Sequence, residues 1–225
     1  MAEVLNRVIE KAIRGSAPAQ INVPRDYWTQ VIDIELPPIV RFERQGGGKE
    51  AIENAAKLLS KAKFPVILSG AGVVLGGAID ECKKLAEKLD APVCNGYQHN
   101  DSFPGSHPLA VGPLGYNGSK AAMELISKAD VVLALGTRLN PFSTLPGYGI
   151  DYWPKKATII QVDMNPDRIG LTKKVSVGIC GDAKQVAQQI LDKLTSDAGN
   201  TGREERKNLI HKTKSAWLQT LSGLD

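Results

Sequence analysis

The 225-residue sequence contains few cysteines and few aromatic residues, and it has no long apolar run. Cys82, Cys94 and Cys180 lie far apart without a CxxC pair, which excludes a disulfide scaffold and a zinc ribbon. No run approaches the ~18 apolar residues of a membrane span, and residues 1–15 lack the apolar core of a signal peptide. These absences predict a cytoplasmic protein that does not enter a membrane. Aromatic residues make up only 5% of the chain, so stacking gives no argument for or against a bound ring.

Neither sign of charge strongly dominates the chain. The chain has 28 Lys and Arg against 24 Asp and Glu, a net charge of +4, and the charges are interspersed. No basic stretch is dense enough for nucleic acid or an anionic membrane, so neither is expected as a partner. The hydrophobic content of 42% is sufficient for a folded core.

The motifs of common catalytic centres are missing. There is no HExxH or HxH pattern, no Walker loop and no Gly-x-Ser-x-Gly elbow. Cys82 falls within a predicted helix and Cys94 at the end of a predicted strand, and neither is expected to be a nucleophile. His99 and His107 fall on a long loop, where hydrogen-bonded structural roles are favoured over catalytic ones, and His211 is expected to face solvent. The residue chemistry alone therefore predicts a ligand-binding domain without an evident reaction centre.

The order of apolar segments predicts the fold. A helix over 2–14 and a strand over 19–23 precede an extended linker over 27–47, which carries a Pro pair and a Gly triplet. Between residues 48 and 196, continuous apolar strands then alternate with amphipathic helices, which is typical of a parallel sheet covered on both faces. The fold class is therefore α/β, with a doubly wound, mostly parallel Rossmann-like sheet, a partial N-terminal αβ piece and a C-terminal helix. The expected strands are 64–68, 92–94, 131–135, 157–162 and 175–179; the expected helices are 49–62, 78–89, 119–129, one capped by Asp182 that reaches Leu194, and 204–221.

Three further expectations concern the irregular segments. Residues 69–77 are expected to form a glycine-rich turn, and 95–118 and 136–156 to form long loops. Residues 196–203 are expected to be a second linker. The last helix, 204–221, is expected to have no packing partner within the chain.

Ligands of open parallel sheets bind at the carboxyl ends of the strands, where several candidate residues fall. Gly70 and Gly72 can let a phosphate or adenylate approach the backbone, or can simply allow tight packing, because the spacing GxGxxG is not met. Arg138 is placed for a diphosphate or a carboxylate, with a salt bridge at the domain rim as the alternative. Asp163 is placed either for ribose hydroxyls or for a turn cap.

Several segments together resemble a known superfamily. These are SGAGV after a strand, HPLAVGPLGYNGSKAA, ADVVLALGTRLN, IIQVDMNPDRIG, and GDAK before a helix. In this order they are similar to the central domain of thiamine-diphosphate enzymes of the acetolactate synthase superfamily. APAQINVPRDYW resembles the end of the preceding pyrimidine-binding domain. The resemblance implies four parts: a domain tail over 1–26, a linker over 27–47, the central domain over 48–196, and a linker and helix over 197–225 that lead towards a C-terminal domain.

Within the superfamily, QINVPRDYWTQVIDIELPPI and NGYQHNDSFPGSHPLAVGPLGYNG look most like the sulfoacetaldehyde acetyltransferase family. That family converts sulfoacetaldehyde and phosphate into acetyl phosphate and sulfite in taurine and sulfonate breakdown. The resemblance implies thiamine diphosphate and Mg²⁺ as cofactors, and a homodimer or homotetramer. It also implies a possible adenine nucleotide or FAD in the central domain, contacted by Gly70, Gly72, Arg138, Asp163 and Asp182.

The sequence departs from the family pattern at the metal motif. Gly181-Asp182 is followed by Ala183, and no GDG motif occurs elsewhere. The expectation is therefore a fragment that is inactive alone, whose missing N- and C-terminal domains hold the cofactor and the catalytic glutamate. Two alternatives remain open: the central domain of an acetolactate synthase or related decarboxylase, and a stand-alone nucleotide-binding or interaction module.

Overall fold

The computed structural model describes residues 2–15, 17–35, 38 and 43–223. The chain divides into two units, Met1–Glu43 and Arg44–Asp225. The first unit contains the helix α1, Ala2–Gly15, and the short 3-10 helix η1, Arg25–Thr29. Residues 17–24 form no strand, so the predicted strand over 19–23 is wrong. A strand needs a neighbour for its backbone hydrogen bonds, and the described residues of this unit provide none.

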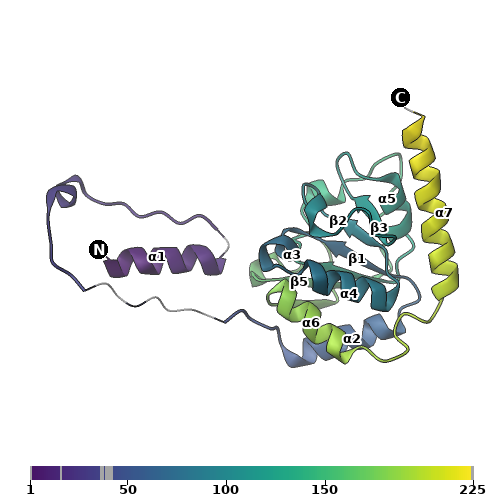
Figure 1. Cartoon of the computed structure of the whole chain (residues 1–225), viewed down its shortest axis with the longest axis horizontal. Helices are drawn as coiled ribbons and strands as arrows, with labels where there is room; N and C mark the ends of the chain where they lie inside the picture. The colour runs from purple at the N-terminus through teal and green to yellow at the C-terminus, as the bar shows by residue number, and fades with distance from the viewer. Residues whose placement is uncertain (1, 16, 36–37, 39–42, 224–225) are drawn as a thin grey trace. The chain divides into compact units, whose positions relative to one another are not determined.

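The second unit is built on a parallel sheet with the strand order β3-β2-β1-β4-β5-β6 (Figure 1). All five strand pairs are parallel, which confirms the predicted fold class. β1 and β4 lie at the centre and every residue in them is buried, as expected of strands covered on both faces. The strands are β1 Pro65–Ser69, β2 Val93–Asn95, β3 Ala110–Pro113, β4 Val131–Leu135, β5 Thr158–Asp163 and β6 Val177–Cys180.

Helices cover the sheet from both sides (Figure 1). On one side α4, Ile79–Leu89, packs against α6, Ala183–Lys193, which also contacts α2, Lys49–Lys61. On the other side α5, Lys120–Ile126, packs against β2, β3 and the long helix α7, Arg203–Ser222. Among the described helices, none combines the length and the apolar character needed to cross a membrane.

The contact between α5 and α7 contradicts the prediction that the last helix lacks a partner. The sequence of α7 gives little indication of this packing, because its buried residues include the charged Arg206 beside Ile210 and Thr213. Lys214 of the same helix donates hydrogen bonds to the carbonyl oxygens of His107 and Pro108, at 3.3 and 2.8 Å. Polar contacts to backbone oxygens thus replace part of the apolar face that a packed helix normally shows.

Two irregular segments also contain elements that the sequence did not predict. The segment 69–77 holds the short helix α3, Ala71–Gly76, which ends at Gly77 in the left-handed conformation. The segment 95–118 holds β3, which pairs with β2. Both elements are short and rich in Gly or Pro, so they show neither helical nor strand periodicity. Three short 3-10 helices complete the unit: η2 Asn100–Ser102, η3 Pro141–Thr144 and η4 Pro166–Arg168.

Candidate functional site

The candidate site is the carboxyl edge of the sheet. β1, β4, β5 and β6 are neighbours and run parallel, so the residues that follow them share one edge. The predicted residues Gly70, Arg138 and Asp182 follow β1, β4 and β6, and Asp163 is the last residue of β5. The chain leaves β1 towards β2 and returns on the other side as β4, which makes the β1–β4 boundary the switch point where such folds bind ligands.

The structure fills this switch point with the protein's own backbone. The amide of Gly70 donates to the Leu135 carbonyl oxygen at 3.1 Å, and the amide of Gly72 donates to the Gly136 carbonyl oxygen at 2.8 Å. A Cβ atom on Gly72 would lie 2.7 Å from the Gly136 Cα atom, which is too close for any side chain. These glycines therefore serve the tight packing of α3 against the loop after β4, while a phosphate contact at Gly70 or Gly72 stays a prediction.

The two predicted acidic residues serve as caps. The Asp163 carboxylate is buried and accepts the amide of Asn165 at 2.9 Å, the turn-cap arrangement that the sequence left open. Asp182 is buried at the start of α6, where its Oδ1 atom accepts the amides of Lys184 and Gln185. Its Oδ2 atom forms an ion pair with Arg44 at 3.2 Å. Both carboxylates are therefore engaged within the domain.

Arg138 differs from the other four predicted residues. Its side chain is exposed, and it forms no hydrogen bond or ion pair with another residue of the described chain. Of the five, it is therefore the side chain best placed to meet an anion. A contact between Arg138 and a diphosphate or carboxylate stays a prediction.

Sequence reasoning missed Gln161, whose side chain holds together the loops at this edge. Its side chain is 1% exposed and lies within the apolar strand β5. The Nε2 atom donates to the carbonyl oxygens of Thr137 and Arg168, each at 3.1 Å, and Oε1 accepts the amide of Gly170 at 2.9 Å. Gln161 thus joins the loops after β4 and β5. The only signal in the sequence is a single amide side chain inside the run TIIQVD.

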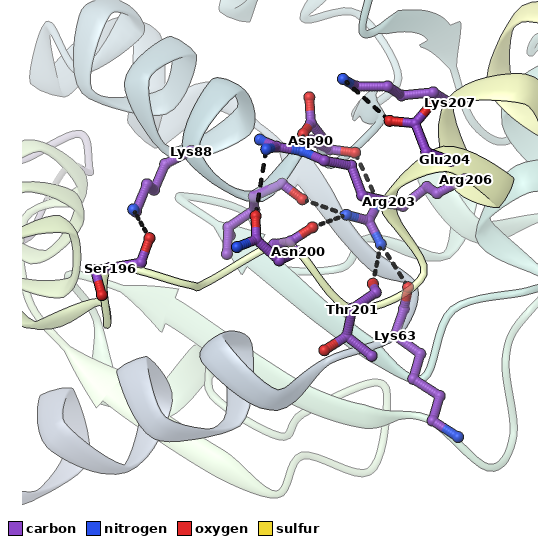
Figure 2. Close-up of polar contacts among 12 residues, drawn as sticks. Lys63, Lys88, Asp90, Ser196, Asn200, Thr201, Arg203, Glu204, Arg206 and Lys207 are labelled. Carbon is purple, nitrogen blue, oxygen red and sulfur yellow. Dashed lines mark hydrogen bonds and ion pairs between the residues drawn. The ribbon is translucent and has the colours of Figure 1, made fainter.

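Sequence reasoning also missed Arg206, whose acceptors include Lys63, just before the start of β1, and whose polar contacts are drawn in Figure 2. Its guanidinium is 1% exposed and donates five hydrogen bonds to backbone carbonyl oxygens, two of them at the carboxyl end of α4. A surface hollow of about 820 Å³ lies beside it, lined by the start of α7 and by Lys63 and Phe64. The five acceptors are the carbonyl oxygens of Lys63, Leu89, Asp90, Gly199 and Thr201. The hollow therefore belongs to the joint between α4 and α7 that Arg206 forms, and this joint lies far from the candidate edge in the fold.

The cysteines lack the chemistry of nucleophiles. Cys82 and Cys94 are fully buried. Burial raises the pKa of Cys82 to about 12 and raises the pKa of Cys94 as well, because both lie where a thiolate would lose its hydration. At neutral pH both thiols are therefore protonated.

We expect a thiol reagent such as Ellman's reagent at pH 8 to modify only the half-exposed Cys180 in the folded chain. In denaturant all three cysteines become accessible and titrate. The Cys180→Ser variant is the control and loses the reaction of the folded state. Rapid modification of this variant would contradict the assignment of Cys82 and Cys94 as inert core residues.

The metal site that the resemblance implies is not formed by the described part of this chain. Within those residues, no group of three His, Cys, Asp or Glu side chains is placed to hold a metal ion. Thiamine-diphosphate enzymes bind their cofactor through such a metal, and the side chains described here do not fit that role. The described residues therefore supply packing and caps at this edge, and no ligand set for the cofactor's metal.

Comparison with known proteins identifies the family of this domain. The family description "Thiamine pyrophosphate enzyme, central domain" matches residues 52–190, more than half of the chain. The chain belongs to this family. The X-ray structure described as "a putative thiamin diphosphate-dependent enzyme isolated from Mycobacterium smegmatis" matches with a TM-score of 0.58 and 25% identity. The match covers 72% of this chain and 31% of that one.

Curated relatives of this chain include sulfoacetaldehyde acetyltransferases and an acetolactate synthase subunit. "Probable sulfoacetaldehyde acetyltransferase" of Rhizobium meliloti (strain 1021) is 79% identical over 99% of this chain and 38% of its own length. "Sulfoacetaldehyde acetyltransferase" of Roseovarius nubinhibens is 76% identical over 100% of this chain and 37% of its own length. "Acetolactate synthase large subunit" of Corynebacterium glutamicum is 30% identical over 99% of this chain and 34% of its own length. The chain thus matches less than two fifths of each relative, and its likeness to the acetyltransferases is far greater.

Proposed function

We propose that this chain supplies the central domain of a sulfoacetaldehyde acetyltransferase, an enzyme that converts sulfoacetaldehyde and phosphate into acetyl phosphate and sulfite. The observation that carries the proposal is the 79% identity to a relative of that name over 99% of the chain. The identity to the acetolactate synthase subunit of Corynebacterium glutamicum is only 30% over the same span. If the chain shared only its fold with both groups, its sequence identities to the two groups would be similar.

Within such an enzyme, this domain has a supporting role. The predicted edge residues Asp163 and Asp182 cap turns and helices, and the glycines at the switch point pack against backbone. Thiamine diphosphate, Mg²⁺ and the reacting groups belong to other domains of the parent, which acts as a cytoplasmic homodimer or homotetramer in the breakdown of taurine and other sulfonates. Arg138 remains the residue of this edge through which a nucleotide or another anion is contacted.

A chimera tests the proposal. The matching region of the Roseovarius nubinhibens enzyme is replaced with this chain, which aligns over 225 residues at 76% identity. We expect the chimera to release sulfite from sulfoacetaldehyde in the presence of phosphate, at a rate within about tenfold of the parent enzyme, because tenfold corresponds to only ~1.4 kcal/mol of barrier.

The matched control inserts the chain in the same way into the Corynebacterium glutamicum acetolactate synthase subunit, where the identity is 30%. That chimera is expected to lose acetolactate formation, because most interdomain contacts change. A folded Roseovarius chimera without sulfite release, judged by its melting temperature, would refute the proposed function. Retained synthase activity in the control would favour the acetolactate synthase alternative.

A further inference from the structure

Lys214 of α7 differs from many other lysines in the groups that it contacts. Its Nζ atom donates to the carbonyl oxygens of Pro108 at 2.8 Å and His107 at 3.3 Å, and the described residues give it no carboxylate partner. Six lysines of the described chain do form ion pairs with a carboxylate: Lys83, Lys120, Lys155, Lys184, Lys193 and Lys207. Lys214 therefore lacks the anion that holds each of these six in its charged form.

The two segments that meet at Lys214 contain no acidic residue. Residues 206–222 of α7 include no Asp or Glu, and neither do residues 102–119, which supply the two carbonyl oxygens. The basic residues in this part of α7 are Arg206, Lys207, Lys212 and Lys214. His211 precedes Lys214 by three residues, so the two side chains lie on the same face of the helix. A small anion that approaches Lys214 therefore meets attraction and little repulsion.

The charged side chains on the neighbouring elements have partners of their own. α5 packs against α7 (Figure 1), and its two charged residues, Lys120 and Glu124, pair with each other at 3.8 Å. Glu87 of α4 lies 3.2 Å from the Nε2 atom of His107. These carboxylates are engaged elsewhere, so they do not stabilise the ammonium form of Lys214.

The contacts of Lys214 suit a neutral amine. An ammonium group has three N–H donors, and loss of one proton leaves two, which is the number of carbonyl oxygens that the Nζ atom meets. The neutral amine therefore keeps both hydrogen bonds, and its lone pair points away from them. Burial lowers the pKa of Lys214 because the charged group loses hydration, whereas a hydrogen bond to Asp151 raises the pKa of the exposed Lys155. Desolvation of this kind makes a lysine more nucleophilic at neutral pH.

We propose that Lys214 is a site of acetylation by acetyl phosphate, a small anionic acetyl donor. The amine nitrogen forms a bond to the carbonyl carbon of the acetyl group, and the bond between that carbon and the bridging phosphate oxygen breaks. Inorganic phosphate leaves with the electron pair, and the proton of the amine passes to water. The inference rests on the proposed function only for the source of the donor, because acetyl phosphate is the product proposed for the parent enzyme. The product then modifies the domain that belongs to the enzyme forming it.

Acetylation changes how α7 is held. The acetylated nitrogen is an uncharged amide with a single N–H, so it can donate to only one of the carbonyl oxygens of His107 and Pro108. The contact between α7 and the turn before β3 is weakened as a result. The acetylated chain is therefore expected to melt at a lower temperature than a Lys214→Arg chain treated in the same way.

The test is site-resolved acetylation of the purified chain by added acetyl phosphate at mildly alkaline pH, followed by mass spectrometry. The matched control is Lys212, an exposed lysine two residues earlier on the same helix. We expect Lys214 to react about threefold or more faster than Lys212, because each unit by which a pKa falls raises the neutral fraction of an amine about tenfold. Lys214→Arg is expected to remove the fastest phase of acetylation, and Lys212→Arg to retain it. In denaturant the preference for Lys214 is expected to disappear.

Two results would overturn the proposal. One is a folded chain in which Lys212 is acetylated as fast as Lys214 or faster. The other is a preference for Lys214 that persists in denaturant, because the reactivity would then come from the local sequence and not from the fold. Since the donor is added from outside, neither result depends on catalysis by the parent enzyme. A chimera that releases no sulfite refutes the proposed function and leaves the reactivity of Lys214 unchanged.

Discussion

Replacement of Arg206 by methionine is expected to lower the free energy of unfolding by about 3–5 kcal/mol, because it leaves buried carbonyl oxygens without a donor. The guanidinium donates to five such oxygens, at 2.6 to 2.9 Å. Two of them, on Leu89 and Asp90, lie at the end of α4, where the helix leaves its last carbonyls without an internal donor and the helix dipole favours a cation. Burial lowers the pKa of Arg206, but its ordinary value lies so high that the side chain stays charged.

Chemical denaturation of the whole chain measures this effect. The matched control is Lys207→Met, one residue further along α7, where the side chain is exposed and the change is expected to stay within about 0.5 kcal/mol. Arg206→Lys keeps the charge but loses the planar fork, so an intermediate loss is expected. An Arg206→Met protein as stable as the Lys207→Met protein would show that the five contacts contribute nothing.

The second large effect is expected from Gly115→Ala, which we predict to lower the free energy of unfolding by about 3 kcal/mol or more. Two causes combine at this position. Gly115 has a φ of +80°, where an L-residue is strained. A Cβ atom there would overlap the carbonyl oxygen of Phe142 and lie 2.8 Å from the Ser143 Cα atom. Both neighbours are backbone, so they cannot turn away as a flexible side chain would.

Two other glycines separate these causes. Gly77 has a φ of +65°, but a Cβ atom placed on it would have no neighbour within 4 Å, so Gly77→Ala isolates the backbone strain, about 1–2 kcal/mol. Gly105 also has no such neighbour, and its φ is not positive, so Gly105→Ala is expected to be close to neutral. Thermal or denaturant unfolding of the three variants is expected to give losses in the order Gly115, Gly77, Gly105. Equal losses at Gly115 and Gly77 would eliminate the steric part of the argument.

The fold could be predicted from the sequence wherever burial leaves a long pattern. The runs FPVIL and VVLAL correspond to β1 and β4, because a central parallel strand is covered on both faces and needs apolar residues throughout. β3 has only four residues, including Gly112 with a φ of +92° and Pro113, so its pattern is that of a loop. Its place in the sheet depends on pairing with β2, which no local signal encodes.

The candidate site was predictable only in part. The capping role of Asp182 follows from local sequence, and the structure confirms it. For Asp163 the sequence left a ribose contact and a turn cap open, and the structure shows the turn cap. Arg206 had no comparable signal, because its acceptors come from segments between residues 63 and 201 that meet only in the folded chain. An arginine near the start of a polar helix has the sequence pattern of a solvated surface.

The backbone nature of the Arg206 acceptors has a consequence for divergence among related sequences. A carbonyl oxygen is supplied by every residue type, so exchange of the side chains of Lys63, Leu89 or Thr201 leaves the acceptors in place. Neutral drift at those positions is therefore expected to spare the joint between α4 and α7. Selection on the joint falls instead on a single codon, the one that encodes the guanidinium.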